Sequence, residues 1–193
     1  MPKVKTPMNP HWEDKLTCLE KITDEQLLYA LKEMHIDIPL DKYRFAFSAI
    51  CVPEIFSNIS EDEILRAGGY PKEFASGVNE VKSYSFFIIK GYISFLYMRS
   101  DVIEKRLNKN NISKNSPLYA FSEILSHDKK CPTPGQRIRN ALAHGGIEVD
   151  RDEGKLVFND LQWTSKISFK TFDGFCNQIK RFYLCLFEAS KRV

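Results

Sequence analysis

The chain has 193 residues, of which 43% are hydrophobic and 27% are charged, a composition typical of a folded globular protein. This length suffices for one domain with a sizeable core and does not require two, so we expect a single domain over residues 1–193. The net charge is only +3, which argues against a strongly basic nucleic-acid-binding protein. Any contact with RNA must therefore come from a local patch.

The five cysteines form an odd set without a Cys-x-x-Cys pair, which argues against a disulfide framework and a zinc ribbon. They are predicted to be small buried hydrophobic residues in a reducing cytoplasm. The segment "MPKVKTPMNPHWEDK" lacks the apolar core of a signal peptide. The most apolar run, 84–98, is interrupted by Lys90 and Gly91 and is shorter than the roughly 20 residues of a membrane span. We expect a cytoplasmic protein that makes no membrane contact.

In chain order, residues 1–10 are predicted to form a flexible tail, because they contain several prolines and no apolar periodicity. A helix should follow Thr23, which can act as its N-cap, with Gln26 at the capping-box position. Pro39 should close this helix. Residues 42–52 fit either a helix or a short strand.

Residues 60–70 predict a short helix that ends at a Gly-Gly pair. No proline occurs between Lys72 and about Lys109, and the pattern there is mostly helical and apolar nearly all round in its middle. This stretch predicts a long helix at the centre of a bundle. Another short helix is expected after Ser116, which would be its N-cap.

The stretch "RIRNALAHGG", residues 137–146, lies at the end of the next predicted helix. Thr133 is a natural N-cap, and Pro134 suits the first helical position. The Gly-Gly pair after His144 is a typical helix stop. The sequence therefore predicts a helix from about Pro134 to His144.

Residues 147–158 alternate around a polar turn that contains Gly154, which predicts a β-hairpin. From Ser168 the pattern returns to helix, with apolar residues at helical spacing. The predicted fold class is thus all-α, or mainly α: a helical bundle with one small β-hairpin after the motif helix.

His144 has two interpretations. A histidine in the last turn of a helix is favoured by the helix dipole and can bond an unpaired carbonyl, so it can be an ordinary terminus. Alternatively, histidine is the side chain whose pKa suits acid–base catalysis near neutral pH, and arginine grips phosphate oxygens. A histidine and an arginine at one phosphate make a minimal site for metal-independent RNA cleavage.

Helix geometry limits how these residues meet. At about 100° per residue, Arg139 and His144 lie roughly 140° apart around the helix and do not share a face. Asn140 shares the face of His144, and Arg137 lies on the same stripe roughly 10 Å away along the axis. Two copies of the helix across a two-fold axis can pool Arg139 and His144 in one cleft. The spacing therefore favours a composite site in a homodimer.

The string "IRNALAHG" resembles the signature of the HEPN superfamily, in which an arginine and a polar residue precede a histidine by a few positions. Arg139, Asn140 and His144 fit it with four intervening residues, and Arg137 fits with six. The resemblance covers about eight residues, and it implies a HEPN-like domain over 1–193. In one branch of the family, a tyrosine two residues after the histidine is modified. This chain has Gly146 at that position.

The resemblance implies a homodimeric, metal-independent endoribonuclease without a cofactor, a toxin or anti-phage effector that acts with an antitoxin or regulatory partner protein. His144 would be the acid–base or phosphate-contacting group, Arg139 the phosphate stabiliser and Asn140 a positioning donor. Arg137, Lys129 and Lys130 would contact RNA, although all three also fit solvated surface charges. Some members of the superfamily bind nucleotide or form dimers without cleaving RNA, and this alternative stays open.

Overall fold

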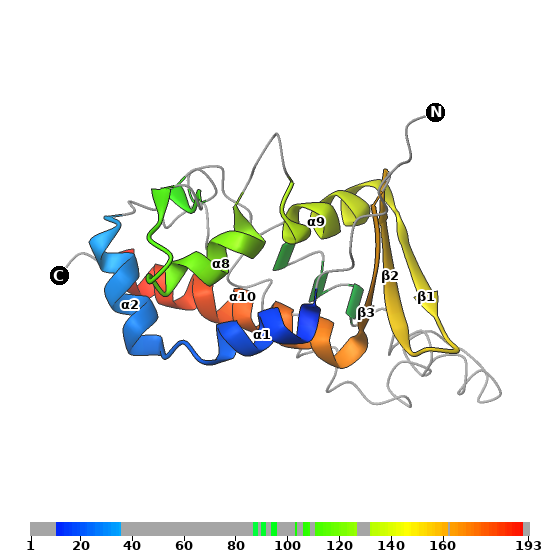
Figure 1. Cartoon of the computed structure of the whole chain (residues 1–193), viewed down its shortest axis with the longest axis horizontal. Coiled ribbons are helices and arrows are strands. Elements are labelled where there is room, and N and C mark those ends of the chain that lie inside the picture. The colour runs from blue at the N-terminus through cyan, green and yellow to red at the C-terminus, as the bar shows by residue number, and fades with distance from the viewer. Residues whose placement is uncertain are drawn as a thin grey trace, which may run out of the picture.

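The computed structural model describes residues 11–35, 111–126, 132–161 and 163–190, with a few further positions between 87 and 108. Within these ranges the helices are α1 (Trp12–Glu20), α2 (Asp24–Glu33), α8 (Leu118–Leu125), α9 (Pro134–His144) and α10 (Phe169–Ser190). The strands are β1 (Ile147–Asp150), β2 (Lys155–Asp160) and β3 (Trp163–Ser168). The sheet stands at one end of the molecule and α2 at the other (Figure 1).

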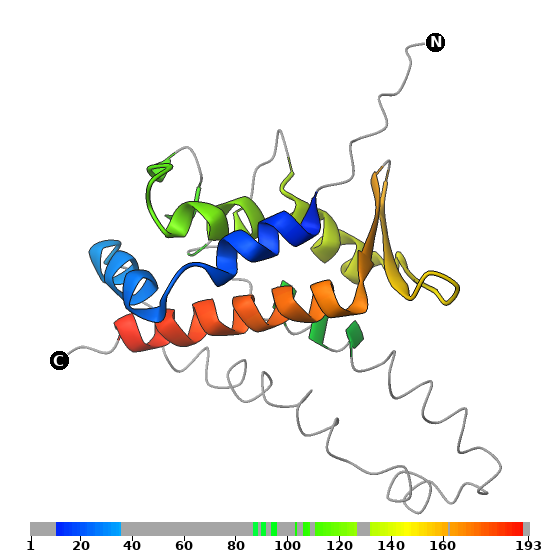
Figure 2. The ribbon, with the colours of Figure 1, turned by 60° about the horizontal axis from the view of Figure 1, so that its bottom comes forward.

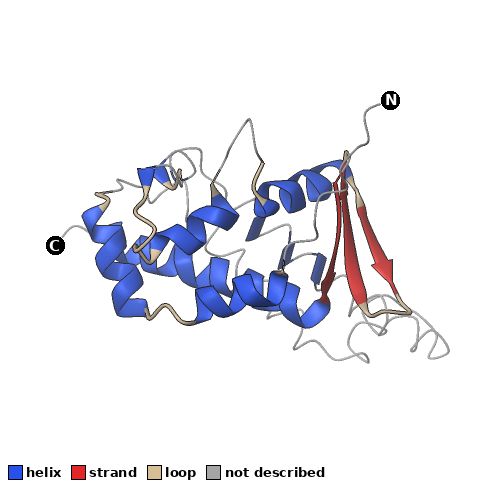
Figure 3. Ribbon diagram, in the orientation of Figure 1, coloured by secondary structure: helices blue, strands red, loops and turns tan. Residues whose placement is uncertain are grey.

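The prediction of an all-α fold is wrong. The described residues combine helices with a three-stranded antiparallel sheet of order β1-β2-β3, so the fold is mixed α/β (Figure 3). The predicted hairpin is confirmed as β1 and β2, with Gly154 in the turn at a φ of 61°. The third strand, β3, is absent from the prediction, although Trp163, Ser165 and Ile167 are buried in strict alternation with more exposed residues.

The inner face of the sheet is apolar and lies against the helices. Leu156 pairs with Ile167 across β2 and β3, and Phe158 pairs with Ile147 across β1 and β2. Leu156, Phe158 and Ile167 are buried, and α9 packs against β2. Because side chains alternate along a strand, the next inward position of β2 after Phe158 is its last residue, Asp160.

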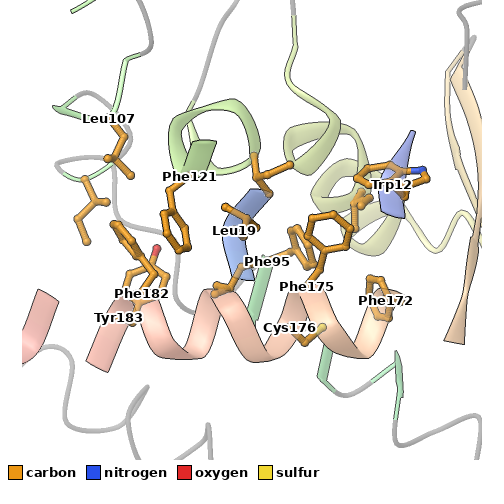
Figure 4. Packing of buried hydrophobic residues seen from close by; sticks show 14 of the residues in the cluster. Trp12, Leu19, Phe95, Leu107, Phe121, Phe172, Phe175, Cys176, Phe182 and Tyr183 are labelled. Carbon is orange, nitrogen blue, oxygen red and sulfur yellow. The ribbon is translucent and has the colours of Figure 1, made fainter. Parts of the chain in front are cut away.

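The long helix α10 forms the floor of the core, and α1 lies alongside it (Figure 2). The buried residues of α10 recur at helical spacing, which explains why the sequence predicts this helix correctly. Figure 4 shows these side chains facing residues of α1 and α8. The Trp12 ring of α1 meets Phe175 edge to face at 5.3 Å, and its indole N–H donates to Ser165 at 2.8 Å. The helix α1 thus joins α10 to the sheet, and the prediction assigns no element to this segment.

The capping box predicted at Thr23, at the start of α2, is confirmed. The Thr23 side chain accepts from the backbone N–H of Gln26, and the Gln26 side chain accepts from that of Thr23. The helix ends at Glu33, before the predicted stop at Pro39. The N-cap of α8 is Pro117 instead of Ser116, but the Ser116 hydroxyl still accepts the N–H of Leu118 at 3.3 Å.

Several predictions lie outside the described residues: the tail over 1–10 and the segments over 42–52 and 60–70. Of the long helix predicted over 72–109, the described positions 87, 88, 90, 91, 103 and 106 are helical, and 94–95 have a π-helical conformation. No helix in the described parts of the chain is long and apolar enough to cross a bilayer.

The cysteine prediction is confirmed for two positions and wrong for one. Cys176 and Cys185 are buried, and burial raises the pKa of the Cys176 thiol to about 12. Cys18 is exposed on α1, while Cys51 and Cys131 lie outside the described residues. Cys176 is therefore a neutral core side chain at physiological pH, not a nucleophile.

Candidate active site

The motif helix α9 spans the residues that the sequence predicts. Pro134 opens it, and the Thr133 side chain accepts the N–H of Gln136 at 3.3 Å. At the other end, Gly145 takes a left-handed φ of 70°. The N–H of Gly146 donates to the carbonyl of Ala141, five residues earlier, at 2.8 Å, which is the 6→1 bond of a Schellman motif.

The C-terminal end of α9 is tied to β2. The carbonyl of Gly146 accepts the N–H of Asn159 at 2.8 Å. A Cβ atom at Gly146 would collide with the carbonyl of Asn159, so the two backbones approach too closely for any side chain. His144 therefore belongs to a helix end whose position relative to the sheet is set by backbone contacts.

Replacing Gly146 by alanine is expected to lower the free energy of unfolding by about 1–3 kcal/mol, because the added methyl group forces α9 away from β2. The matched control is Gly145→Asn. Gly145 has open space around its Cβ position, and asparagine tolerates the left-handed conformation. Denaturant unfolding of both variants checks the prediction, and an equal loss in both would contradict it.

The imidazole of His144 is exposed. Its helix end is already closed by the backbone N–H groups of Gly145 and Gly146, which bond to the carbonyls of Leu142 and Ala141. The histidine side chain is therefore not needed to satisfy these two carbonyls. A ligand can reach the ring from solvent.

Two polar side chains of α9 converge on one carboxylate of the sheet. Asp160 is 5% exposed. Its Oδ2 atom accepts from Arg137 Nη1 at 3.0 Å and from Asn140 Nδ2 at 3.2 Å. Arg139 Nη1 in turn donates to Asn140 Oδ1 at 2.6 Å. One carboxylate thus connects three of the polar residues that the sequence singles out.

Asp160 is missing from the sequence-based prediction, although the sequence contains a signal for it. Leu156, Phe158 and Asp160 occupy alternate positions of β2, so the aspartate must point to the same face as two core residues. A carboxylate on a buried face needs donors nearby. The helix α9, which packs against β2, carries such donors in its two arginines and its asparagine.

Arg139 and His144 lie in different surroundings. Arg139 is half-buried and lines a cavity of about 20 Å³ together with Ser126 of the α8 end and Tyr183 of α10. His144 is exposed at the end of the helix. Since α9 is helical throughout, its geometry keeps these two side chains on different faces. Arg137, Asn140 and His144 instead follow one stripe, at spacings of three and four residues.

Lys129 and Lys130 lie outside the described residues. In the part of the chain that the structure describes, no group of three or more His, Cys, Asp or Glu side chains could hold a metal ion. The candidate site is therefore the group of polar residues that lies where α9 packs against β2.

Comparison with models of known protein families, with curated proteins and with solved structures gives no match.

Proposed function

We propose that the protein is a metal-independent endoribonuclease of the HEPN type. The observation that carries the proposal is the exposed imidazole of His144 at the closed end of α9, on the helix that also bears Arg137, Arg139 and Asn140. In this proposal the protein acts in the cytoplasm as a toxin or anti-phage effector, and an antitoxin or regulatory partner protein controls it.

The chemistry needs no group outside the chain and its RNA. The ribose 2′-oxygen attacks the adjacent phosphorus, and the bond from phosphorus to the 5′-oxygen of the next nucleotide breaks. His144 takes the proton from the 2′-hydroxyl, and the imidazolium that forms gives a proton to the leaving 5′-oxygen. The guanidinium of Arg139 stabilises the charge that develops on the phosphorane, and Asn140 holds that guanidinium. The products are a 2′,3′-cyclic phosphate and a 5′-hydroxyl.

A homodimer is part of the proposal. Arg139 and His144 of one chain are about 140° apart around α9, so one chain does not easily bring both to the same phosphate. Two α9 helices that meet across a two-fold axis bring the arginine of one copy to the histidine of the other. Arg137, beside them on α9, would contact the RNA further along its backbone.

The test of this function compares nucleic acids that differ at one oxygen. Wild-type protein in EDTA is expected to cut a synthetic RNA and to leave DNA of the same sequence intact, because DNA lacks the attacking 2′-hydroxyl. A chimera with a single 2′-deoxynucleotide at the mapped cleavage position should resist cutting at that position alone. Cleavage of the DNA, or undiminished cleavage at the deoxy position, would contradict the proposed mechanism.

One observation favours a second candidate function, a dimerising RNA- or nucleotide-binding module that does not cleave. Arg137 is neutralised by Asp160, and Arg139 is half-buried, so both guanidinium groups have partners within the chain. If the protein is such a module, RNA should bind to it and should be recovered intact after long incubation. His144→Ala should then leave the function of the protein unchanged.

A further inference from the structure

The carboxylate of Asp160 lies between the sheet and α9. Asp160 is the last residue of β2, its side chain is almost fully buried, and it accepts hydrogen bonds from Arg137 and Asn140 of α9. Burying a carboxylate is costly unless donors compensate it. Arg137 and Asn140 provide those donors, so the buried charge fixes the two side chains as much as they stabilise it.

Asn140 extends this effect to a second arginine. Its Nδ2 donates to Asp160, which leaves its Oδ1 to accept from Arg139 Nη1 at 2.6 Å. The carboxylate determines this orientation, because a carboxylate accepts hydrogen bonds and cannot donate to the amide oxygen. A flip of the Asn140 amide would break both bonds. Asp160 therefore orients Arg137 directly and Arg139 through Asn140.

We propose that Asp160 is a positioning residue of the RNA site, which holds Arg137 and, through Asn140, Arg139 in the orientation that meets the phosphate backbone. This inference rests on the proposed function. A positioning role for Asp160 predicts opposite effects on RNA binding and on the reaction rate, which a merely structural role does not predict. A negative charge beside two phosphate-binding arginines weakens the binding of RNA, while the order that it imposes speeds the reaction.

The variant Asp160→Asn separates these two effects, since it removes the charge and keeps the shape. We expect kcat to fall by roughly tenfold or more, because the arginines lose their fixed orientation. We expect the dissociation constant of an RNA analogue with 2′-deoxynucleotides, which cannot be cleaved, to fall by roughly twofold to tenfold at low salt, because repulsion is removed. Turnover and affinity therefore change in opposite directions.

The matched control is Asp150→Asn. Asp150 also ends a strand and pairs with a cation at 2.7 Å, but this cation, Lys166, lies on β3 and not on α9. Its replacement should leave kcat and affinity for the analogue unchanged. Should Asp160→Asn fail to fold, Asn140→Ala tests the connection to Arg139: kcat should fall without a gain in affinity, because the Asp160 charge and its bond to Arg137 remain.

The outcomes separate the inference from the proposed function. An Asp160→Asn protein that is folded and has wild-type kcat and affinity overturns the inference and leaves the nuclease intact. A loss of affinity that parallels the loss of activity and of thermal stability also overturns it, since a structural role alone would have that effect. If the wild type cleaves no RNA, the proposed function is wrong. The binding measurement alone then decides whether the charge of Asp160 weakens the binding of RNA.

Discussion

Replacing His144 by alanine is expected to lower the rate of RNA cleavage by about 100-fold to 10,000-fold, the usual contribution of a positioned acid–base group. The loss should be purely catalytic. His144 is exposed, and the carbonyls at its helix end are bonded to backbone N–H groups of Gly145 and Gly146, so the fold does not depend on the ring. The measurement is the initial rate of cleavage of an end-labelled RNA in EDTA, together with the unfolding temperature.

The control for this prediction is His11→Ala. His11 is also an exposed histidine at a helix boundary, the N-cap of α1, and its side chain makes no cap hydrogen bond. This variant should cut RNA at the wild-type rate. A His144→Ala protein that cuts equally fast would show that the histidine is an ordinary helix terminus.

The second large effect concerns the dimer. Arg139→Ala and His144→Ala proteins are each expected to be nearly inactive, but an equimolar mixture that is allowed to exchange subunits should regain cleavage on the order of tens of fold above either variant alone. The reason is the geometry of α9. Because Arg139 and His144 of one chain lie on different faces, a complete site takes the arginine of one copy and the histidine of the other. A mixed dimer contains one such intact pair.

Subunit exchange must be shown independently, for example by labelling each variant with a different fluorophore and observing energy transfer. The double variant, with Arg139→Ala and His144→Ala in the same chain, is the control, since its mixture with either single variant lacks one of the two groups. No recovery in a mixture that does exchange subunits would contradict the composite site. It would favour instead a site within one chain, built from the stripe of Arg137, Asn140 and His144.

The elements that the sequence predicts well have strong local signals. The helix α9 has an N-cap, a proline at its first position and a left-handed glycine after its last residue, and its observed bounds agree with the prediction. The capping box at Thr23 and the hairpin turn at Gly154 are similarly local. In each case a few neighbouring residues suffice to define the conformation.

The elements that the prediction misses lack such a local signal. The strand β3 follows β2 across a turn without glycine, in which Leu161 takes a left-handed φ of 52°. The helix α1 is stabilised by the contacts of Trp12 with Phe175 and Ser165, more than 150 residues away in sequence. Asp160 shows the same limit for the site. Its alternation with Leu156 and Phe158 predicts an inward carboxylate, but which donors meet it depends on how α9 packs on β2.

The chemical identity of the product ends tests the central claim most directly. RNA cut by the wild-type protein in EDTA can be analysed by mass spectrometry, which distinguishes a cyclic phosphate from an open one. Attack by the 2′-hydroxyl, with His144 as acid–base group and arginine at the phosphate, predicts fragments with 2′,3′-cyclic phosphate and 5′-hydroxyl ends. Fragments with 3′-hydroxyl and 5′-phosphate ends, or intact RNA after incubation with a large excess of folded protein, would contradict it.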